Sequence, residues 1–115
     1  MGSSYRIAAS GLTVAALSLD VSANNVANAL TEGFDPTELA PADLDGGGVT
    51  AKVIAKQDPL AEVRADRALL APSGTDLAQE MVAQSRALAV YQVNLVSLKT
   101  GDEMARTLVE DVGSR

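Results

Sequence analysis

The sequence predicts a mainly α-helical protein with a long helix at each end and a small β element between them. Three observations support this fold class. Apolar residues recur with helical spacing near both ends, turn-forming residues cluster in the middle, and a segment of alternating apolar and polar residues follows them. The organisation that we expect is a helix over residues 1–30, a flexible linker over 31–48, a small β element over 49–72 and a helix over 73–115.

The N-terminal helix is predicted by a seven-residue repeat. Leu12, Leu19 and Val26 recur at this spacing, and small residues are interleaved with them. The opposite side of the helix is also largely apolar, because Asp20 is the only charged residue within residues 7–31. A helix that is apolar on nearly all sides needs cover over most of its surface. We therefore expect this helix to pack against other helices.

Three asparagines, Asn24, Asn25 and Asn28, lie near the end of this helix. Asn is a poor residue in a helix interior because its amide competes for nearby backbone groups, but it suits a helix end. One interpretation is therefore a C-terminal cap before Gly33. In the other, Asn24 and Asn28, one turn apart, hydrogen-bond to a neighbouring chain at a packed joint, as buried Asn does in coiled coils. Both interpretations can hold together.

The middle of the chain is predicted to hold a mobile linker and a two-stranded ribbon. Pro, Asp and Gly interrupt residues 31–48 every few positions, which is typical of a linker. Residues 49–56 alternate apolar with mostly polar side chains, and residues 62–66 are the candidate second strand. A two-stranded ribbon is marginally stable alone in water. We expect it to lean on a helix or on a neighbouring subunit.

The C-terminal helix is predicted by one apolar face that continues for roughly nine turns. The face consists of Leu77, Met81, Gln84, Leu88, Tyr91, Leu95, Leu98, Ala105 and Val109, with an interruption near Gly101. Thr75 or Asp76 suits the N-cap position, and Gly113 is the expected end. At 1.5 Å per residue, such a helix is about 55 Å long, far longer than a domain of this size needs for its own core. Its length predicts a partner along it.

Composition excludes several classes of function. Hydrophobic residues make up 47% of the 115 residues but aromatic residues only 3%, so burial depends on Ala, Val and Leu, which favour close helix-to-helix contact. The net charge of -6 argues against nucleic acid as a partner. The absence of His and Cys excludes Ser-His-Asp and Cys-His nucleophiles, disulfides and the common zinc sites. We expect no enzymatic activity, no cofactor, no metal and no small-molecule substrate.

Two local motifs are too weak to predict a ligand site. Gly46, Gly47 and Gly48 are not followed by the Lys-Ser or Lys-Thr of a phosphate-binding loop, so a flexible entry into a strand is expected there. Asp43 and Asp45 lack the further ligands that a cation requires, so a solvated turn is expected.

The N-terminal helix also bears on membrane insertion and export. Ser, Thr, Gly and Asp interrupt it, so we do not expect a continuous membrane span of about 20 apolar residues. The amino end does not show a basic start, an apolar block and a small-residue cleavage site in the order of a secretory signal peptide. We expect any export from the cytoplasm to use another route.

Both ends of the chain resemble the rod and hook axial proteins of the bacterial flagellum. The N-terminal similarity is carried by residues 19–29, LDVSANNVANA, and by residues 31–34, TEGF. The C-terminal similarity is carried by residues 80–82, 86–87, 91–94, 98–104 and 107–109. The two signatures stand in the right order at the right ends, and the short middle is most similar to the small proximal-rod class of the basal-body rod proteins.

This resemblance implies a fold and a function. The two terminal helices would pair as an antiparallel coiled coil, and many subunits would stack into a helical tube, the periplasmic rod of the basal body, which transmits torque. The implied partners are other rod or axial subunits, the chain itself and the flagellar type III export apparatus, with export that needs no cleaved signal peptide. When isolated, the chain is expected to form a homo-oligomer, and heterologous contacts that do not close would build the tube.

The resemblance assigns the packing role at the assembly interface to residues of both helices. In the first helix these are Leu12, Leu19, Asn24, Asn25, Val26 and Asn28. In the last helix they are Met81, Leu88, Tyr91, Asn94, Leu95, Leu98 and Met104. Tyr91 also has a physical argument of its own, because it lies on the apolar face and its hydroxyl needs a partner when buried. Plain core packing is the alternative role for Tyr91.

Two other classes of protein are the alternatives. In an acidic helical adaptor or chaperone-like binding module, the helical pair would capture a partner helix in a groove and form a discrete heterodimer. An enzyme that uses Asp and Glu as acid and base is a distant third. Self-association into larger assemblies distinguishes the rod subunit from both.

Overall fold

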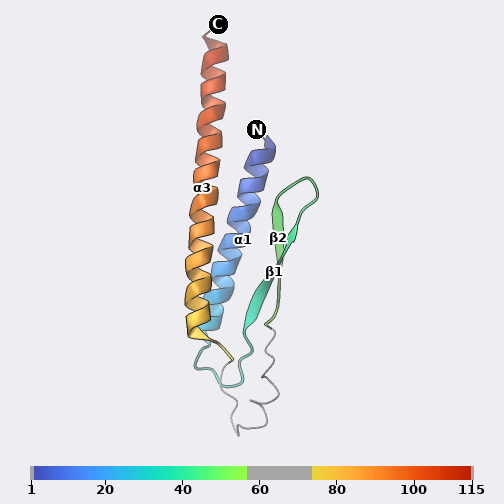
Figure 1. Cartoon of the computed structure of the whole chain (residues 1–115), viewed down its shortest axis with the longest axis vertical. Helices are drawn as coiled ribbons and strands as arrows, with labels where there is room; N and C mark the ends of the chain where they lie inside the picture. Colours follow the sequence, from blue (N-terminus) through green and yellow to red (C-terminus); the bar gives the residue numbers. More distant parts are fainter. Residues whose placement is uncertain (1, 57–73, 115) are drawn as a thin grey trace.

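The computed structural model describes residues 2–56 and 74–114. Helix α1 spans Gly2–Ala27, strands β1 and β2 span Thr37–Asp43 and Val49–Ala55, and helix α3 spans Leu77–Gly113. The molecule is elongated, with principal extents of 77 × 25 × 14 Å. Figure 1 shows the two helices side by side and the hairpin along α1. The predicted fold class, long terminal helices with a small β-hairpin between them, is confirmed.

The two helices pair in opposite directions. Near the start of α1, the Tyr5 hydroxyl donates a hydrogen bond to Asp102 Oδ1 at 3.1 Å. Near its end, Ser22 Oγ donates to the backbone oxygen of Glu80 at 3.1 Å. Early residues of α1 therefore lie beside late residues of α3, as the antiparallel pairing requires.

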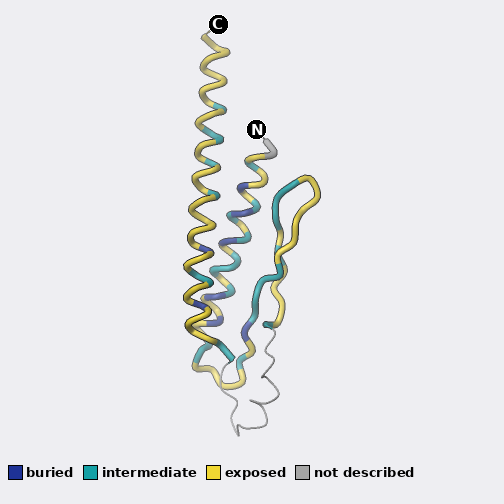
Figure 2. Tube along the Cα trace, in the orientation of Figure 1, coloured by how far each residue is buried: buried dark blue, intermediate teal, exposed yellow. Residues whose placement is uncertain are grey.

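Small residues, and not the leucines, form the contact between the helices. Among the described residues of the two helices, the buried side chains are Ala8, Ala15, Ser22 and Asn25 of α1, and Glu80 and Ala87 of α3. Buried segments of the backbone trace are dark blue in Figure 2. Gly11 is also buried, and a Cβ added there would lie 2.5 Å from Asn94 Oδ1. A glycine permits a close approach of this kind because it has no side chain. The stripe that is interleaved with Leu12, Leu19 and Val26 is the one that faces α3.

The hairpin differs from the ribbon that the sequence predicts. β1 and β2 pair antiparallel, with Thr37 opposite Ala55 and Asp43 opposite Val49, so β1 lies inside the segment expected to be a linker. Ala and Pro give β1 a low intrinsic strand propensity, and its pairing with β2 decides its conformation. The candidate strand at residues 62–66 lies outside the described residues.

A turn of three glycines closes the hairpin and brings it against α1. Gly46, Gly47 and Gly48 have φ angles of +85°, +98° and +102°, a region that residues with a side chain rarely adopt. Arg6 donates hydrogen bonds to the carbonyl oxygens of Gly46 at 2.9 Å and Gly47 at 3.1 Å, and the Val49 amide donates to Ser10 Oγ at 3.0 Å. The expectation that the ribbon leans on a helix is confirmed.

Helix α3 begins and ends where its capping signals predict. Asp76 is the N-cap, and its Oδ1 accepts hydrogen bonds from the amides of Ala78 at 3.0 Å and Gln79 at 3.2 Å. The helix ends at Gly113 and continues through Gly101 without a break. Its 37 residues span about 55 Å at 1.5 Å per residue.

By length and composition alone, α1 could cross a membrane. The segment Ser4–Ala27 has a mean hydropathy of 1.3 and is the one such helix among the described residues. No membrane span is expected from the sequence, because Ser, Thr, Gly and Asp interrupt the helix. The mean hydropathy of the segment is nevertheless high, because its Ala, Val and Leu residues outweigh these polar residues. A helix covered by other parts of a protein passes the same test, and Ser22 and Asn25 of α1 make buried polar contacts with α3.

Candidate assembly surface

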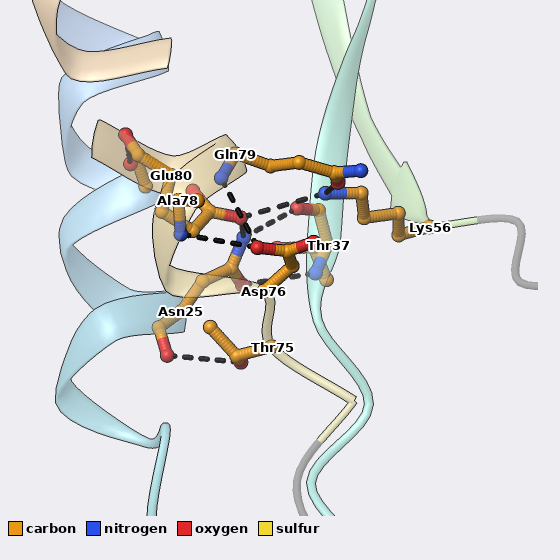
Figure 3. Close-up of polar contacts among 9 residues, drawn as sticks. Asn25, Thr37, Lys56, Thr75, Asp76, Ala78, Gln79 and Glu80 are labelled. Atoms are coloured by element: carbon orange, nitrogen blue, oxygen red, sulfur yellow. Dashed lines mark hydrogen bonds and ion pairs between the residues drawn. The ribbon is translucent and has the colours of Figure 1, made fainter. Parts of the chain in front are cut away.

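A polar junction joins α1, the hairpin and α3 at one end of the helix pair (Figure 3). Its centre is Asn25, which is 1% exposed. Asn25 Nδ2 donates to the Thr37 carbonyl at 2.8 Å and to Glu80 Oε1 at 2.9 Å, and its Oδ1 accepts from the Thr37 amide at 3.0 Å. Because its donors and its acceptor are all matched, this amide is stable when buried. One side chain thus fixes the start of β1 and the first turn of α3.

Glu80 is the charged member of the polar junction. Its side chain is nearly buried, and Lys56 Nζ lies 3.6 Å from Glu80 Oε1 while it donates to Gln79 Oε1 at 3.0 Å. A buried carboxylate is costly unless it is paired and hydrogen-bonded, and Lys56 and Asn25 supply both kinds of partner. Thr75 completes the junction by donating to the backbone oxygen of Asn25 at 3.1 Å.

The polar junction has the features of a structural joint. Among the described residues, no buried side-chain nitrogen or oxygen is left without a hydrogen-bond partner. Within the same residues, no cluster of three or more Asp and Glu could hold a metal ion. The hydrogen bonds of the junction connect the three elements, and each of these bonds is made within the chain itself.

Tyr5 forms a second contact between the helices, near the other end of the pair. Its hydroxyl donates to Asp102, which also forms an ion pair with Arg106 at 3.2 Å. Desolvation raises the pKa of Tyr5 above its ordinary value of 10.0, and the hydrogen bond to Asp102 and the charge of Asp102 raise it further. The positive charge of Arg106 lowers this pKa and so acts in the opposite direction. The contact therefore favours the protonated form of Tyr5.

A partly exposed apolar surface, the leucine flank, lies along one side of the helix pair. It consists of Leu12, Leu19 and Val26 on α1 and of Met81, Leu88 and Leu95 on α3. Seven-residue spacing aligns each set of three on its helix, and Leu19 lines one shallow pocket together with Met81 and Leu88. Met81 is 68% exposed and Leu88 50% exposed. Exposed apolar side chains that are aligned in this way are typical of an interaction site.

The other residues predicted for the interface lie in different surroundings. Tyr91 is 36% exposed at the edge of the leucine flank, and Leu98 is half-buried. Asn94 lies between the helices, where its Nδ2 donates to the Val90 carbonyl at 2.9 Å. Met104 is 57% exposed and lies on a different stripe of α3 from Leu88.

The three asparagines of α1 have separate environments. Asn25 is in the polar junction, and Asn24 is exposed. Asn28 Nδ2 donates to the backbone oxygen of Asn24 at 2.9 Å, a bond that the capping interpretation expects. The interpretation in which Asn24 and Asn28 contact a neighbouring chain stays a prediction.

The C-terminal end of α3 projects beyond α1. Tyr5 is level with Asp102, and α1 begins only three residues before Tyr5. Residues 106–114 are all exposed, and Figure 1 shows this part of α3 past the N-terminus. We call residues 106–113, about 12 Å of helix, the free end of α3. Its exposed apolar side chains are Leu108, Val109 and Val112.

A second apolar surface, the hairpin groove, lies between the hairpin and α3. It has a volume of about 500 Å³. Its floor is formed by Val14, Ala15 and Ser18 of α1. Its walls are formed by Glu38, Leu39 and Pro41 of β1, and by Gln79, Val82, Ala83, Arg86, Ala87 and Val90 of α3. The hairpin groove is thus an open and mainly apolar channel with two charged residues in its walls.

Sequence reasoning missed Glu80 and Lys56 as partners and Gly11 as the point of closest approach. Glu80 reads as a helix-start signal, since acidic residues are common in the first turn. Glu80 is one residue past N3, the position at which a capping-box side chain bonds back to the N-cap. Its side chain instead accepts a hydrogen bond from Asn25 of α1. Only the antiparallel pairing brings Asn25, 55 positions earlier in the chain, to its carboxylate.

Comparison with known proteins bears on the first third of the chain. Residues 6–34 match the family model described as flagella basal body rod protein. This segment of the chain is thus similar to that family. The match includes most of α1, with Asn25 and the α1 half of the leucine flank. No curated protein matches the chain.

The family match confirms the resemblance that the N-terminal signature predicts. It supports a structural role in the flagellar basal-body rod, since the rod family is structural, and it associates the chain with other rod components. The C-terminal similarity and the small proximal-rod class stay predictions, because the match ends at residue 34.

Proposed function

We propose that this chain is a subunit of the flagellar rod and assembles through its terminal helices into a helical tube that transmits torque across the periplasm. The leucine flank is the observation that carries the proposal. The helix pair is already held by small residues and by the polar junction, so the leucines are not needed between its own helices. A neighbouring subunit is the cover that this surface lacks.

The strength of one such contact can be worked out from exposure. Full burial of a Leu or Met side chain stabilises by about 1.5–3 kcal/mol, and the side chains of the leucine flank can gain only the part that is still exposed, on average less than half. Six side chains then contribute at most on the order of 6 kcal/mol. Association costs roughly 4–15 kcal/mol in lost freedom of motion. One contact is therefore marginal, and assembly should be concentration-dependent and should need several neighbours for each subunit.

The finer parts of the proposal concern partners and export. The partners would be other copies and other rod or axial subunits, joined by heterologous contacts that do not close. We place the chain in the small proximal-rod class, because its middle segment is short. Export would use the flagellar type III apparatus without a cleaved signal peptide.

Sedimentation and helical content, measured over a range of concentrations, test the proposal. We expect both mass and helicity to rise with concentration in the wild-type chain. Leu88→Asp and Leu95→Asp should abolish both increases, because each places a charge in the contact. Thr100→Asp is the matched control, since it adds the same charge at an exposed position of α3 outside the leucine flank. A compact wild-type monomer at every concentration would contradict the proposal.

The hairpin groove favours a second candidate, an acidic adaptor or chaperone-like module that holds a partner helix. This candidate predicts a discrete heterodimer and no self-assembly. A wild-type chain that remains monomeric alone and binds one helical peptide in a one-to-one complex would favour it over the rod subunit.

A further inference from the structure

We infer that the hairpin groove receives the free end of α3 from a second copy of this chain. The inference rests on the proposed self-assembly and names a contact by which copies could join. It uses a surface that is distinct from the leucine flank, because the hairpin groove opens on the side of the pair where the hairpin lies.

The first observation is that the hairpin groove is lined by small side chains where it meets α1. Its floor consists of Val14, Ala15 and Ser18, none larger than Val, so side chains from outside can approach α1 closely. Along α3 the hairpin groove extends from Gln79 to Val90, about 16 Å at 1.5 Å per residue. A short stretch of helix fits this length.

The second observation is that the free end of α3 has the matching form. It is a single helix of about 12 Å, shorter than the hairpin groove. Leu108 and Val112 lie one turn apart, and Met104 precedes them by one turn, so the three form one ridge. They are 56%, 71% and 57% exposed, and no other element of the described chain packs on the free end.

The third observation is that only another copy can join the two surfaces. Ala83 in the wall of the hairpin groove and Leu108 in the free end belong to the same unbroken helix, so they are about 38 Å apart within one chain. A groove near one end of α3 and a ridge at the other form a pair of unlike surfaces. Contacts between unlike surfaces can propagate from copy to copy.

Both surfaces carry charges of both signs, so opposite charges can meet. The free end of α3 carries Arg106, Glu110 and Asp111, and the walls of the hairpin groove carry Glu38 and Arg86. Arg86 makes no ion pair with any residue that the structure describes, so it is available to an acidic side chain of the second copy. The chain as a whole carries a net charge of -6, so copies repel each other at long range. We expect added salt to favour the contact by screening this repulsion, although it also weakens the Arg86 pair.

Cysteine cross-linking of the full chain tests the inference, because the natural sequence has no Cys. Ala83→Cys and Leu108→Cys variants are mixed under oxidising conditions at a concentration where the wild type self-associates. A disulfide forms only when two Cα atoms lie about 4.4–6.8 Å apart. We expect the mixed disulfide dimer, which links position 83 of one copy to position 108 of the other, to form at least tenfold faster than in the matched control. In the control, Val96→Cys replaces Ala83→Cys, because Val96 is 61% exposed on α3 but lies outside the hairpin groove.

The outcomes separate this inference from the proposed function. If the wild type self-associates but the mixed disulfide dimer forms no faster than the control, the inference is wrong and the rod proposal stands. If the wild type remains monomeric, both fail. Leu108→Asp provides a second measurement, since it changes an exposed residue and should leave the helicity of the monomer intact. It should reduce self-association at least tenfold, and unchanged association would overturn the inference.

Discussion

Replacement of Gly11 by Ala tests the close approach of the two helices most directly. A Cβ at this position would lie 2.5 Å from Oδ1 and 2.7 Å from Cγ of Asn94. Asn94 is held in place by its hydrogen bond to the Val90 carbonyl, at 2.9 Å. The added methyl group must therefore displace this side chain or move the helices apart.

The magnitude follows from two opposing effects. Ala is better than Gly in a helix interior by about 1 kcal/mol, whereas overpacking costs about 1–3 kcal/mol. We expect Gly11→Ala to lower the free energy of unfolding by up to about 2 kcal/mol. Gly101→Ala is the matched control, because Gly101 is also within a helix and nothing lies within 4 Å of its Cβ position. That variant should raise the free energy of unfolding by about 1 kcal/mol.

Urea unfolding followed by far-ultraviolet circular dichroism measures both effects. All variants must be compared at a protein concentration where sedimentation shows the same oligomeric state, because association shifts apparent stability. In an Asn94→Ala background the clash is removed, so Gly11→Ala should become stabilising by about 1 kcal/mol. If Gly11→Ala stabilises the wild-type chain as much as Gly101→Ala does, the helices do not cross closely at Gly11 and the reasoning fails.

Two further predictions concern the polar contacts at the ends of the helix pair. Asn25→Ala should destabilise the chain by about 1–3 kcal/mol in urea unfolding, because it leaves buried groups of Thr37 and Glu80 without a partner, whereas the exposed Asn24→Ala should change stability by less than about 0.5 kcal/mol. Equal effects of the two substitutions would contradict the polar junction. Because the pKa of Tyr5 is higher in the folded chain than its ordinary value of 10.0, protonated Tyr5 contributes to the free energy of unfolding. This contribution is fully present below about pH 10 and is lost as the pH rises through the raised pKa. Unfolding measured on both sides of about pH 10 should show a steeper loss for the wild type than for Tyr5→Phe, and parallel pH profiles would refute the contact with Asp102.

The sequence predicted features that depend on local order. The repeat of Leu12, Leu19 and Val26 indicated the first helix, and Asp76 and Gly113 indicated the bounds of α3. Local hydrogen bonds and helical periodicity decide such features, and both are readable from neighbouring residues. The rod-family signature is also contiguous, which is why a match over residues 6–34 could confirm it.

The strand pairing could not be predicted in the same way. Residues 37–43 contain Ala, Pro and Asp, which favour a linker over a strand. Their strand conformation depends on β2, on the turn of three glycines and on the bond from Asn25 to Thr37. These partners lie outside residues 37–43, and the pattern of residues within 37–43 does not indicate that they pair with it.

The sequence by itself determined that two apolar helices flank a short β element along the chain. It also determined that chemistry based on His or Cys is absent, and that the N-terminal segment has the signature of the rod family. Tertiary structure decided which side of each helix is covered. Two stripes recur every seven residues on α1, one of small residues and one of leucines, and periodicity alone does not say which of them is covered. The small stripe faces α3 because it allows the backbones to approach closely and the polar junction to form. The leucines are thereby left at the edge of the helix contact and partly exposed, where a neighbouring subunit can cover them.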